Sequence, residues 1–222
     1  MSACYLWKNK CEAQSAYDDA IRRGDSRFIS RYWSEFEMSG VEVDSALYYD
    51  LAVRSQDYWG MTASRDLLAR CGLEIPYQQC YDWAVDAHDY EYILCTHNSL
   101  LEENGAVIQY QSIYDWLVSN QSVEIPHCAE IPDLWWMPHR GYKFIMHNHY
   151  VFDGHGVQID YQGIYDWAME QHDYMFLLAY RDAFTEHGVT VYHDAIRQWA
   201  VDAGNDFLCD LDPISVRCLC TQ

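Results

Sequence analysis

Apolar residues recur along this chain with the spacing of one buried helix face. The clearest case lies in residues 77–89, where apolar positions follow the i, i+3, i+4, i+7 pattern. These positions are Cys80, Trp83, Ala84 and Ala87. We therefore expect a helix here that buries this stripe against a neighbouring element.

A second helix is expected directly after the first. Asp89 can cap it, because a carboxylate accepts hydrogen bonds from the unpaired amides of a first helical turn. The helix would run through residues 90–104, and Gly105 would take the left-handed conformation that ends it. The pattern thus predicts a pair of helices followed by a short extended linker.

The same pattern returns at nearly constant intervals. Equivalent anchor positions lie 32, 32, 33, 51 and 32 residues apart, at Asp19, Leu51, Trp83, Trp116, Trp167 and Trp199. A glycine followed by alternating apolar residues stands eleven residues before each of the last five anchors. An aspartate stands six residues after four of the six anchors, Asp19, Leu51, Trp83 and Trp167. Recurrence of a unit too small to bury its own apolar face is typical of repeat proteins.

We predict an all-α fold, an α-solenoid of about six helix-pair repeats of ~32 residues with short extended linkers. It would form a single domain over residues 1–222, with repeats at roughly 8–39, 40–71, 72–104, 105–155, 156–187 and 188–222. The 51-residue interval indicates an inserted loop over about 120–155 in the fourth repeat.

The phrase WAVDAGNDFL, residues 199–208, resembles the helix junction of ankyrin repeats. The resemblance covers each unit only in outline, because the Thr-Pro-Leu-His turn is absent and the second helix is about five residues longer. Ankyrin-like proteins are typically binding scaffolds, so the resemblance implies recognition of a partner and not catalysis.

The charge of the chain is strongly negative and unevenly distributed. Fourteen Lys and Arg stand against 34 Asp and Glu, a formal net charge of −20, and residues 71–139 contain no Lys or Arg. Such a chain would repel nucleic acid and anionic membranes, so the expected partners are cationic. Nine cysteines without a paired framework, no long apolar run and no signal peptide favour a cytoplasmic, reducing environment.

Charged pairs on the predicted first helices change along the chain. In the early copies an aspartate stands four residues before an arginine, and in the later copies it stands four residues before another acid. The pairs are Asp18/Arg22, Asp50/Arg54, Asp82/Asp86 and Asp166/Glu170. Like charges at this spacing destabilise a helix by a few tenths of a kcal/mol. Repulsion retained in one region indicates a cationic partner.

The leading hypothesis is a non-catalytic inhibitor or adaptor that mimics nucleic acid and occupies the basic groove of a nucleic-acid-binding protein. Helix pairs packed ~8–10 Å apart would carry about one net charge per 3 Å, against about one per 1.7 Å in duplex DNA. Phage-encoded inhibitors of restriction or CRISPR systems often have this character. The expected binding residues are Asp82, Asp86, Asp89, Glu91, Asp115, Asp166, Glu170 and Asp173. The competing explanation is that the acidity only keeps the chain soluble.

Two further hypotheses concern the inserted loop. The chain could be a general ankyrin-like scaffold that grips a specific protein through an aromatic insertion, with Trp135 and Trp136 as contacts. It could instead have a metal-dependent activity at histidine-rich positions whose spacing matches no closed zinc site. These positions are His127, Cys128, His139, His147, His149, Asp153 and His155. No nucleophile motif or phosphate-binding loop is present, so we predict no enzyme activity, no cofactor and no metal.

Overall fold

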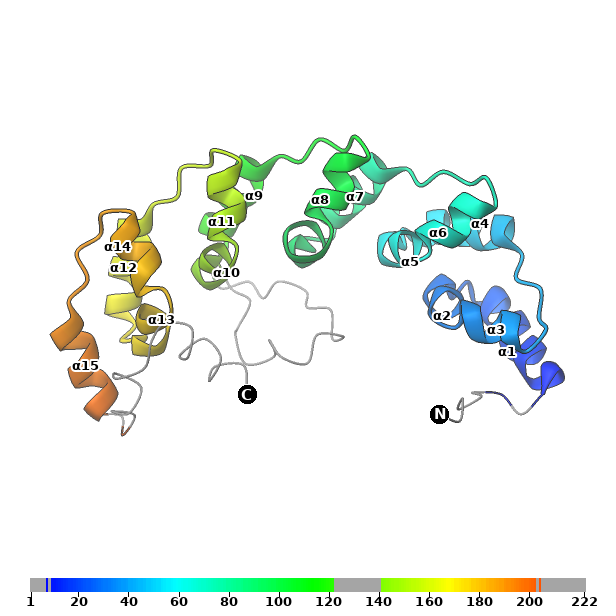
Figure 1. Ribbon diagram of the computed structural model, residues 1–222, viewed down its shortest axis with the longest axis horizontal. Coiled ribbons are helices and arrows are strands. Elements are labelled where there is room, and N and C mark those ends of the chain that lie inside the picture. Colours follow the sequence, from blue (N-terminus) through cyan, green and yellow to red (C-terminus); the bar gives the residue numbers. More distant parts are fainter. Residues whose placement is uncertain (1–6, 8, 122–140, 203, 205–222) are drawn as a thin grey trace. The chain divides into compact units, whose positions relative to one another are not determined.

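The computed structural model describes residue 7 and residues 9–121, 141–202 and 204. These residues are mainly helical and contain no β-strand, which confirms the all-α class (Figure 1). The chain divides into two compact units, residues 1–108 and 109–222. No helix in the described ranges combines the length and the apolar content that a membrane crossing needs.

Unit 1 contains three consecutive helix groups, each with one longer helix followed by two short ones. The first group is α1 (Lys10–Arg23), α2 (Ser26–Arg31) and α3 (Trp33–Met38). The second is α4 (Ser45–Ser55), α5 (Tyr58–Ala63) and α6 (Arg65–Arg70), and the third is α7 (Tyr77–Asp86), the π-helix η1 (Tyr92–Thr96) and α8 (Asn98–Glu103). Each group packs on the next, because α2 contacts α4 and α5, and α5 contacts α7.

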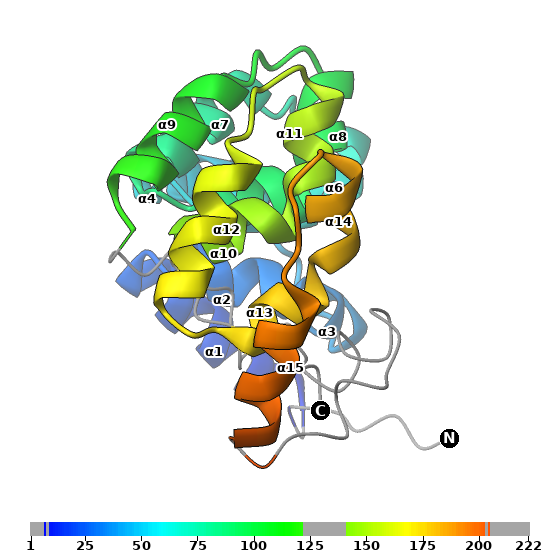
Figure 2. The same cartoon turned by 90° about the vertical axis from the view of Figure 1, so that its left-hand side faces the viewer.

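Unit 2 continues with the same kind of group. It contains α9 (Tyr110–Ser119), α10 (Gly141–His147) and α11 (His149–Gly154), then α12 (Tyr161–Glu170), α13 (Tyr174–Ala179) and α14 (Arg181–Glu186), and finally α15 (His193–Asp202). Helix α9 packs on α10 and α11, and α13 lies against α15 (Figure 2). The loop predicted over about 120–155 is too long, because α10 and α11 occupy residues 141–154. Residues 122–140 lie outside the described ranges.

Each second-helix segment ends at a glycine in the left-handed conformation. These glycines have φ between 72° and 82° and are Gly40, Gly72, Gly105, Gly156 and Gly188. The residue after each glycine donates its amide to the carbonyl oxygen five residues earlier, at 2.9–3.0 Å. This is the hydrogen-bond pattern of a helix C-terminus that glycine permits without a Cβ clash. The predicted role of Gly105 is confirmed.

The second helix of each group is broken in two, whereas the sequence predicted one continuous helix over residues 90–104. One residue between the two short helices takes φ from −128° to −93° and ψ from 6° to 18°. These break residues are Tyr32, Ser64, His97, Asn148 and Tyr180. Their backbone lies in the sparsely populated bridge region. The helix changes direction at these residues, while backbone hydrogen bonds continue across them.

The predicted apolar stripe forms most of the local core. Cys80 and Ala84 are fully buried and Trp83 is nearly so. Ala87 lies beyond the last residue of α7 and is exposed, so its predicted burial is wrong. The core face of α7 therefore ends one turn earlier than the spacing alone indicated.

Tyrosines two residues before the anchors attach first helices to the following linkers. The hydroxyl oxygens of Tyr17, Tyr114 and Tyr165 accept hydrogen bonds from linker amides at 2.9–3.0 Å. The donors are Asp44, Asp160 and Tyr192, respectively. A buried tyrosine thus satisfies a backbone amide of an extended segment that has no sheet partner.

Candidate binding surface

Five of the predicted binding carboxylates lie exposed on the longer first helices. They are Asp82 and Asp86 on α7, Asp115 on α9, and Asp166 and Glu170 on α12. None of the five forms an ion pair with another residue in the described part of the chain. Their negative charge is therefore not cancelled by a cation among the described residues.

Neutral amides orient three of these carboxylates, and Asp18 of α1 in the same way. A glutamine four residues earlier on the same helix donates from Nε2 to the aspartate Oδ1 at 2.7–2.9 Å. The pairs are Gln14–Asp18, Gln78–Asp82, Gln111–Asp115 and Gln162–Asp166. An amide donor fixes the position of a carboxylate without removing its charge. The second carboxylate oxygen then stays open to another donor.

The ion pairs predicted for the early helices do not form. Arg22 pairs with Asp19 at 2.9 Å, while Asp18 accepts from the amide of Gln14. Arg54 donates to the backbone carbonyl of Asp50 at 3.2 Å and not to its carboxylate. The contrast between early and late helices therefore depends on net charge, and not on the loss of ion pairs, because the early helix α1 also carries an amide-held carboxylate.

Two predicted binding residues are buried. Asp89 is 6% exposed and Glu91 is 2% exposed. Asp89 caps the second helix as predicted, because its Oδ1 accepts from the Tyr92 amide at 3.1 Å. Its Oδ2 accepts from the Tyr58 hydroxyl at 2.9 Å and from the Trp59 indole at 2.7 Å. We exclude Asp89 and Glu91 from the binding surface, because a buried carboxylate is not accessible to a partner.

Asp173 also has a structural role. It caps α13, is 21% exposed and forms an ion pair with Lys143, thirty residues earlier. Asp57 is held in the same way, by Ser26 at 2.8 Å and by Arg27 at 3.3 Å. The cap aspartates Asp57, Asp89 and Asp173 thus each join a group to the one before it. Sequence reasoning missed this link, although the constant offset of six residues from the anchor was its signal.

The predicted insertion residues are only partly described. Trp135 and Trp136 lie outside the described ranges, as do His127, Cys128 and His139. The remaining histidine-rich positions fall in and after α10 and α11. Within the residues that the structure describes, no group of three or more His, Cys, Asp or Glu side chains could hold a metal ion.

Cys80 is the buried thiol of the described ranges, and its surroundings are those of a core residue. Burial, with a smaller contribution from the Asp57 carboxylate, raises the pKa of Cys80 to about 12. A nucleophilic cysteine needs the thiolate, so this side chain is protonated and inert at neutral pH.

Comparison with protein-family models, with curated proteins and with solved structures finds no match. We therefore infer the function of the chain from its own geometry and charge.

Proposed function

We propose that this chain is a non-catalytic binding module, an α-solenoid of ankyrin-like helix pairs that docks its acidic first helices on a cationic protein. The observation that carries the proposal is the set of amide-held carboxylates. Asp82, Asp115 and Asp166 are exposed, oriented by glutamine and paired with no cation in the described ranges.

The chemistry of these carboxylates favours a basic groove as the docking site. In a solenoid, equivalent first-helix positions would recur every ~8–10 Å, which gives evenly spaced anionic groups. A protein groove that binds nucleic acid presents Lys and Arg to regularly spaced phosphates. With a net charge of −20, this chain would approach such a groove by electrostatic steering. Its proposed role is that of an inhibitor or adaptor of a nucleic-acid-binding protein.

Two variants with equal change in net charge test this proposal. The surface variant carries Asp82→Asn, Asp86→Asn, Asp115→Asn, Asp166→Asn and Glu170→Gln. The control variant carries five substitutions at other exposed acids, Glu42→Gln, Glu74→Gln, Glu103→Gln, Glu186→Gln and Asp194→Asn. Binding partners are captured from lysate on the wild-type chain at low salt, identified, and then titrated against each variant.

We expect the surface variant to bind the captured basic protein at least tenfold more weakly, and the control variant to bind within about threefold of wild type. Wild-type affinity should also fall steeply between low and ~0.5 M salt, because screening weakens charge pairs. Equal weakening by the two variants, or affinity insensitive to salt, would show that these carboxylates only provide solubility.

A further inference from the structure

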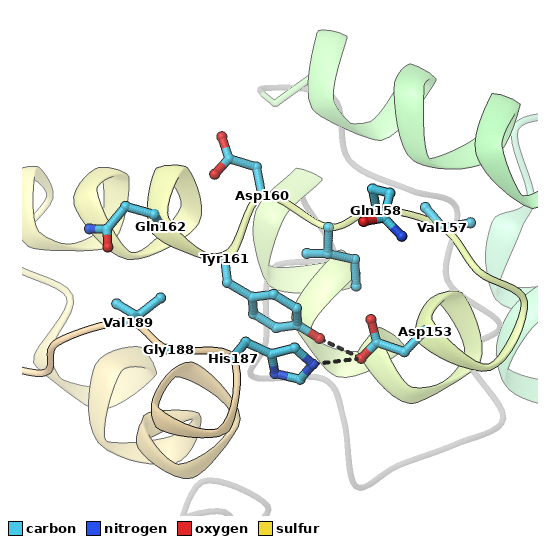
Figure 3. A pocket seen from close by; sticks show the side chains of 10 residues that line it. Asp153, Val157, Gln158, Asp160, Tyr161, Gln162, His187, Gly188 and Val189 are labelled. Atoms are coloured by element: carbon cyan, nitrogen blue, oxygen red, sulfur yellow. Dashed lines mark hydrogen bonds and ion pairs between the residues drawn. The ribbon is translucent and has the colours of Figure 1, made fainter.

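A polar cavity of about 420 Å³ opens in unit 2, beside the start of the first helix α12. It is bordered by the linker residues 157–160, the start of α12, the segment 187–189 and Asp153 near the end of α11 (Figure 3). A volume of this size is within the range of small-ligand sites in proteins. The cavity therefore has room for one side chain of a partner with its flanking backbone.

Asp153 is fixed in this cavity by two side chains from other helices. Its Oδ2 accepts from the Tyr161 hydroxyl at 2.6 Å and lies 3.3 Å from Nε2 of His187 (Figure 3). His187 is itself positioned, because Nδ1 contacts the Ala183 carbonyl at 2.8 Å and its ring stacks on Tyr161 at 3.8 Å. This aromatic frame holds the carboxylate from one side. Tyr161 donates to it directly, and His187 does so in its protonated form, because only then do both ring nitrogens carry a proton.

Tyr161 acts as a permanent donor in this frame. Burial, and then the hydrogen bond to Asp153, raise the pKa of its hydroxyl well above the ordinary value. The hydroxyl consequently keeps its proton at neutral pH and stays bound to Oδ2. The other oxygen of Asp153 points away from Tyr161 and His187, toward the linker (Figure 3).

The lining selects the charge of the ligand. Asp153 and Asp160 are opposed by no Lys or Arg among the lining residues, so the cavity is net negative whether or not His187 is protonated. Anionic ligands are therefore repelled, and the two carboxylates disfavour a purely apolar one. The described residues offer no set of three metal ligands here. An organic cation remains as the class of ligand that this lining stabilises.

We propose that this cavity receives an arginine side chain of the partner, with the guanidinium paired to the open oxygen of Asp153. This inference depends on the proposed function, because the cavity would bind one specific side chain of the same partner that docks on the acidic first helices. A guanidinium is preferred to an ammonium because its flat fork of donors can reach a carboxylate and nearby carbonyl groups together. The linker residues 157–160, which line the cavity, carry backbone carbonyls of this kind.

The test uses N-acetyl-arginine amide as the probe and the full chain as the receptor. Binding is followed by NMR through the backbone amides of Gly188 and Val189, which line the cavity. N-acetyl-citrulline amide serves as the uncharged control of the same shape. We expect saturable shifts with a Kd of about 1–10 mM, as for a single ion pair with a small ligand, and no saturable shifts with citrulline.

Variants then locate the site. Asp153→Asn should weaken arginine binding at least fivefold, whereas Asp182→Asn, an exposed aspartate of α14 outside the cavity, should not change it. The guanidinium assignment is overturned if Asp153→Asn and Asp182→Asn bind N-acetyl-arginine amide equally well. It is also overturned if N-acetyl-citrulline amide or N-acetyl-lysine amide binds the wild-type chain as tightly as N-acetyl-arginine amide does. If Asp153→Asn unfolds the chain, His187→Gln provides the alternative variant, because it removes one support of the carboxylate and should also weaken binding.

The outcomes for the two proposals are distinguishable. If the chain binds the arginine probe but the surface variant binds the partner as tightly as wild type does, the cavity proposal is supported and the acidic-surface proposal is refuted. Loss of partner binding in the surface variant without any arginine binding would refute the cavity alone.

Discussion

Aspartates of this chain have two roles that depend on where they stand in a helix group. An aspartate before the anchor lies on the exposed face of the first helix, as at Asp82 and Asp166. An aspartate six residues after the anchor caps the second helix and accepts donors from the preceding group, as at Asp57 and Asp89. Composition alone counts both kinds as surface charge, which is why the predicted binding set mixed them.

Asp89→Ala should therefore destabilise the protein strongly. The change removes a helix cap and leaves the buried donors of Tyr58 and Trp59 without an acceptor, at a cost of about 3 kcal/mol. Asp82→Ala, on the exposed face of α7, should change the free energy of unfolding by no more than about 0.5 kcal/mol. Urea unfolding of both variants measures the difference, and similar values for the two would contradict the assigned roles.

His97 makes stability depend on pH. Its ring packs against Trp59 and Tyr92, and burial, with a smaller effect of Arg65, lowers its pKa to about 4. Between pH 6.5 and pH 4 the unfolded chain binds a proton that the folded chain does not. The free energy of unfolding should therefore fall as pH decreases through this window, by about 1–2 kcal/mol for a partly exposed ring.

The variant His97→Gln isolates this contribution. Glutamine does not titrate, so the difference in unfolding free energy between the wild type and the variant should shrink as pH falls from 6.5 to 4. A difference that stays constant over this range would show that His97 titrates alike in both states.

At the scale of the element, an irregular interval in the sequence corresponds to an irregular helix. The anchors Trp83 and Trp116 lie 33 residues apart, where 32 is usual, and the distance from Asp89 to Gly105 is 16 residues, where Asp57 to Gly72 is 15. The structure accommodates the extra residue as η1, because a π-helix adds one residue to a turn without changing the flanking helices.

Deletion of Cys95 should convert η1 into an ordinary α-helical turn. This residue is exposed and stands six residues after the cap Asp89, so its removal restores the usual spacing between cap and glycine. We expect the free energy of unfolding to change by less than about 1 kcal/mol. Ala63 occupies the same slot in α5, is also exposed, and has no extra residue to lose. Its deletion rotates α6 by one residue and should cost more than about 3 kcal/mol. Equal costs measured by thermal unfolding would refute this account of η1.

The elements that sequence reasoning predicted correctly are those with a repeated local cause. Gly105 ends its helix and Asp89 begins one because each supplies a conformation or an acceptor that the backbone requires at that point. The breaks in the second helices were not predictable in this way. Ser64, His97 and Tyr180 share no side-chain type, so the change in direction must come from packing with the adjacent group, which a single sequence does not reveal.

The same distinction applies to the candidate site. The exposed carboxylates of the first helices followed from charge and spacing, and their glutamine partners were visible four residues earlier, as in Gln78–Asp82. The cavity around Asp153 was not predictable, because its three fixed side chains come from α11, α12 and the end of α14. The geometry of such a site depends on contacts between helix groups. The spacing of the repeats in the sequence does not show how side chains of different groups are placed.

At the scale of the whole molecule, the longest interval between anchors corresponds to one inserted segment. The interval of 51 residues exceeds the usual 32 by 19, which is the length of residues 122–140 between α9 and α10. The Tyr142 amide donates to the Gln121 side chain at 2.9 Å, so the residues that flank the segment lie close together. A short glycine linker can therefore replace the segment without separating the two helices.

Replacement of residues 122–140 by two glycines distinguishes the acidic surface from the aromatic scaffold hypothesis. The exposed carboxylates of α7, α9 and α12 remain in place, so binding of the cationic partner should stay within about twofold of wild type, with helical circular dichroism unchanged. A Gly/Ser segment of the original length controls for loop closure. If both replacements abolish binding while the helices stay folded, the inserted sequence, and not the set of exposed carboxylates, recognises the partner.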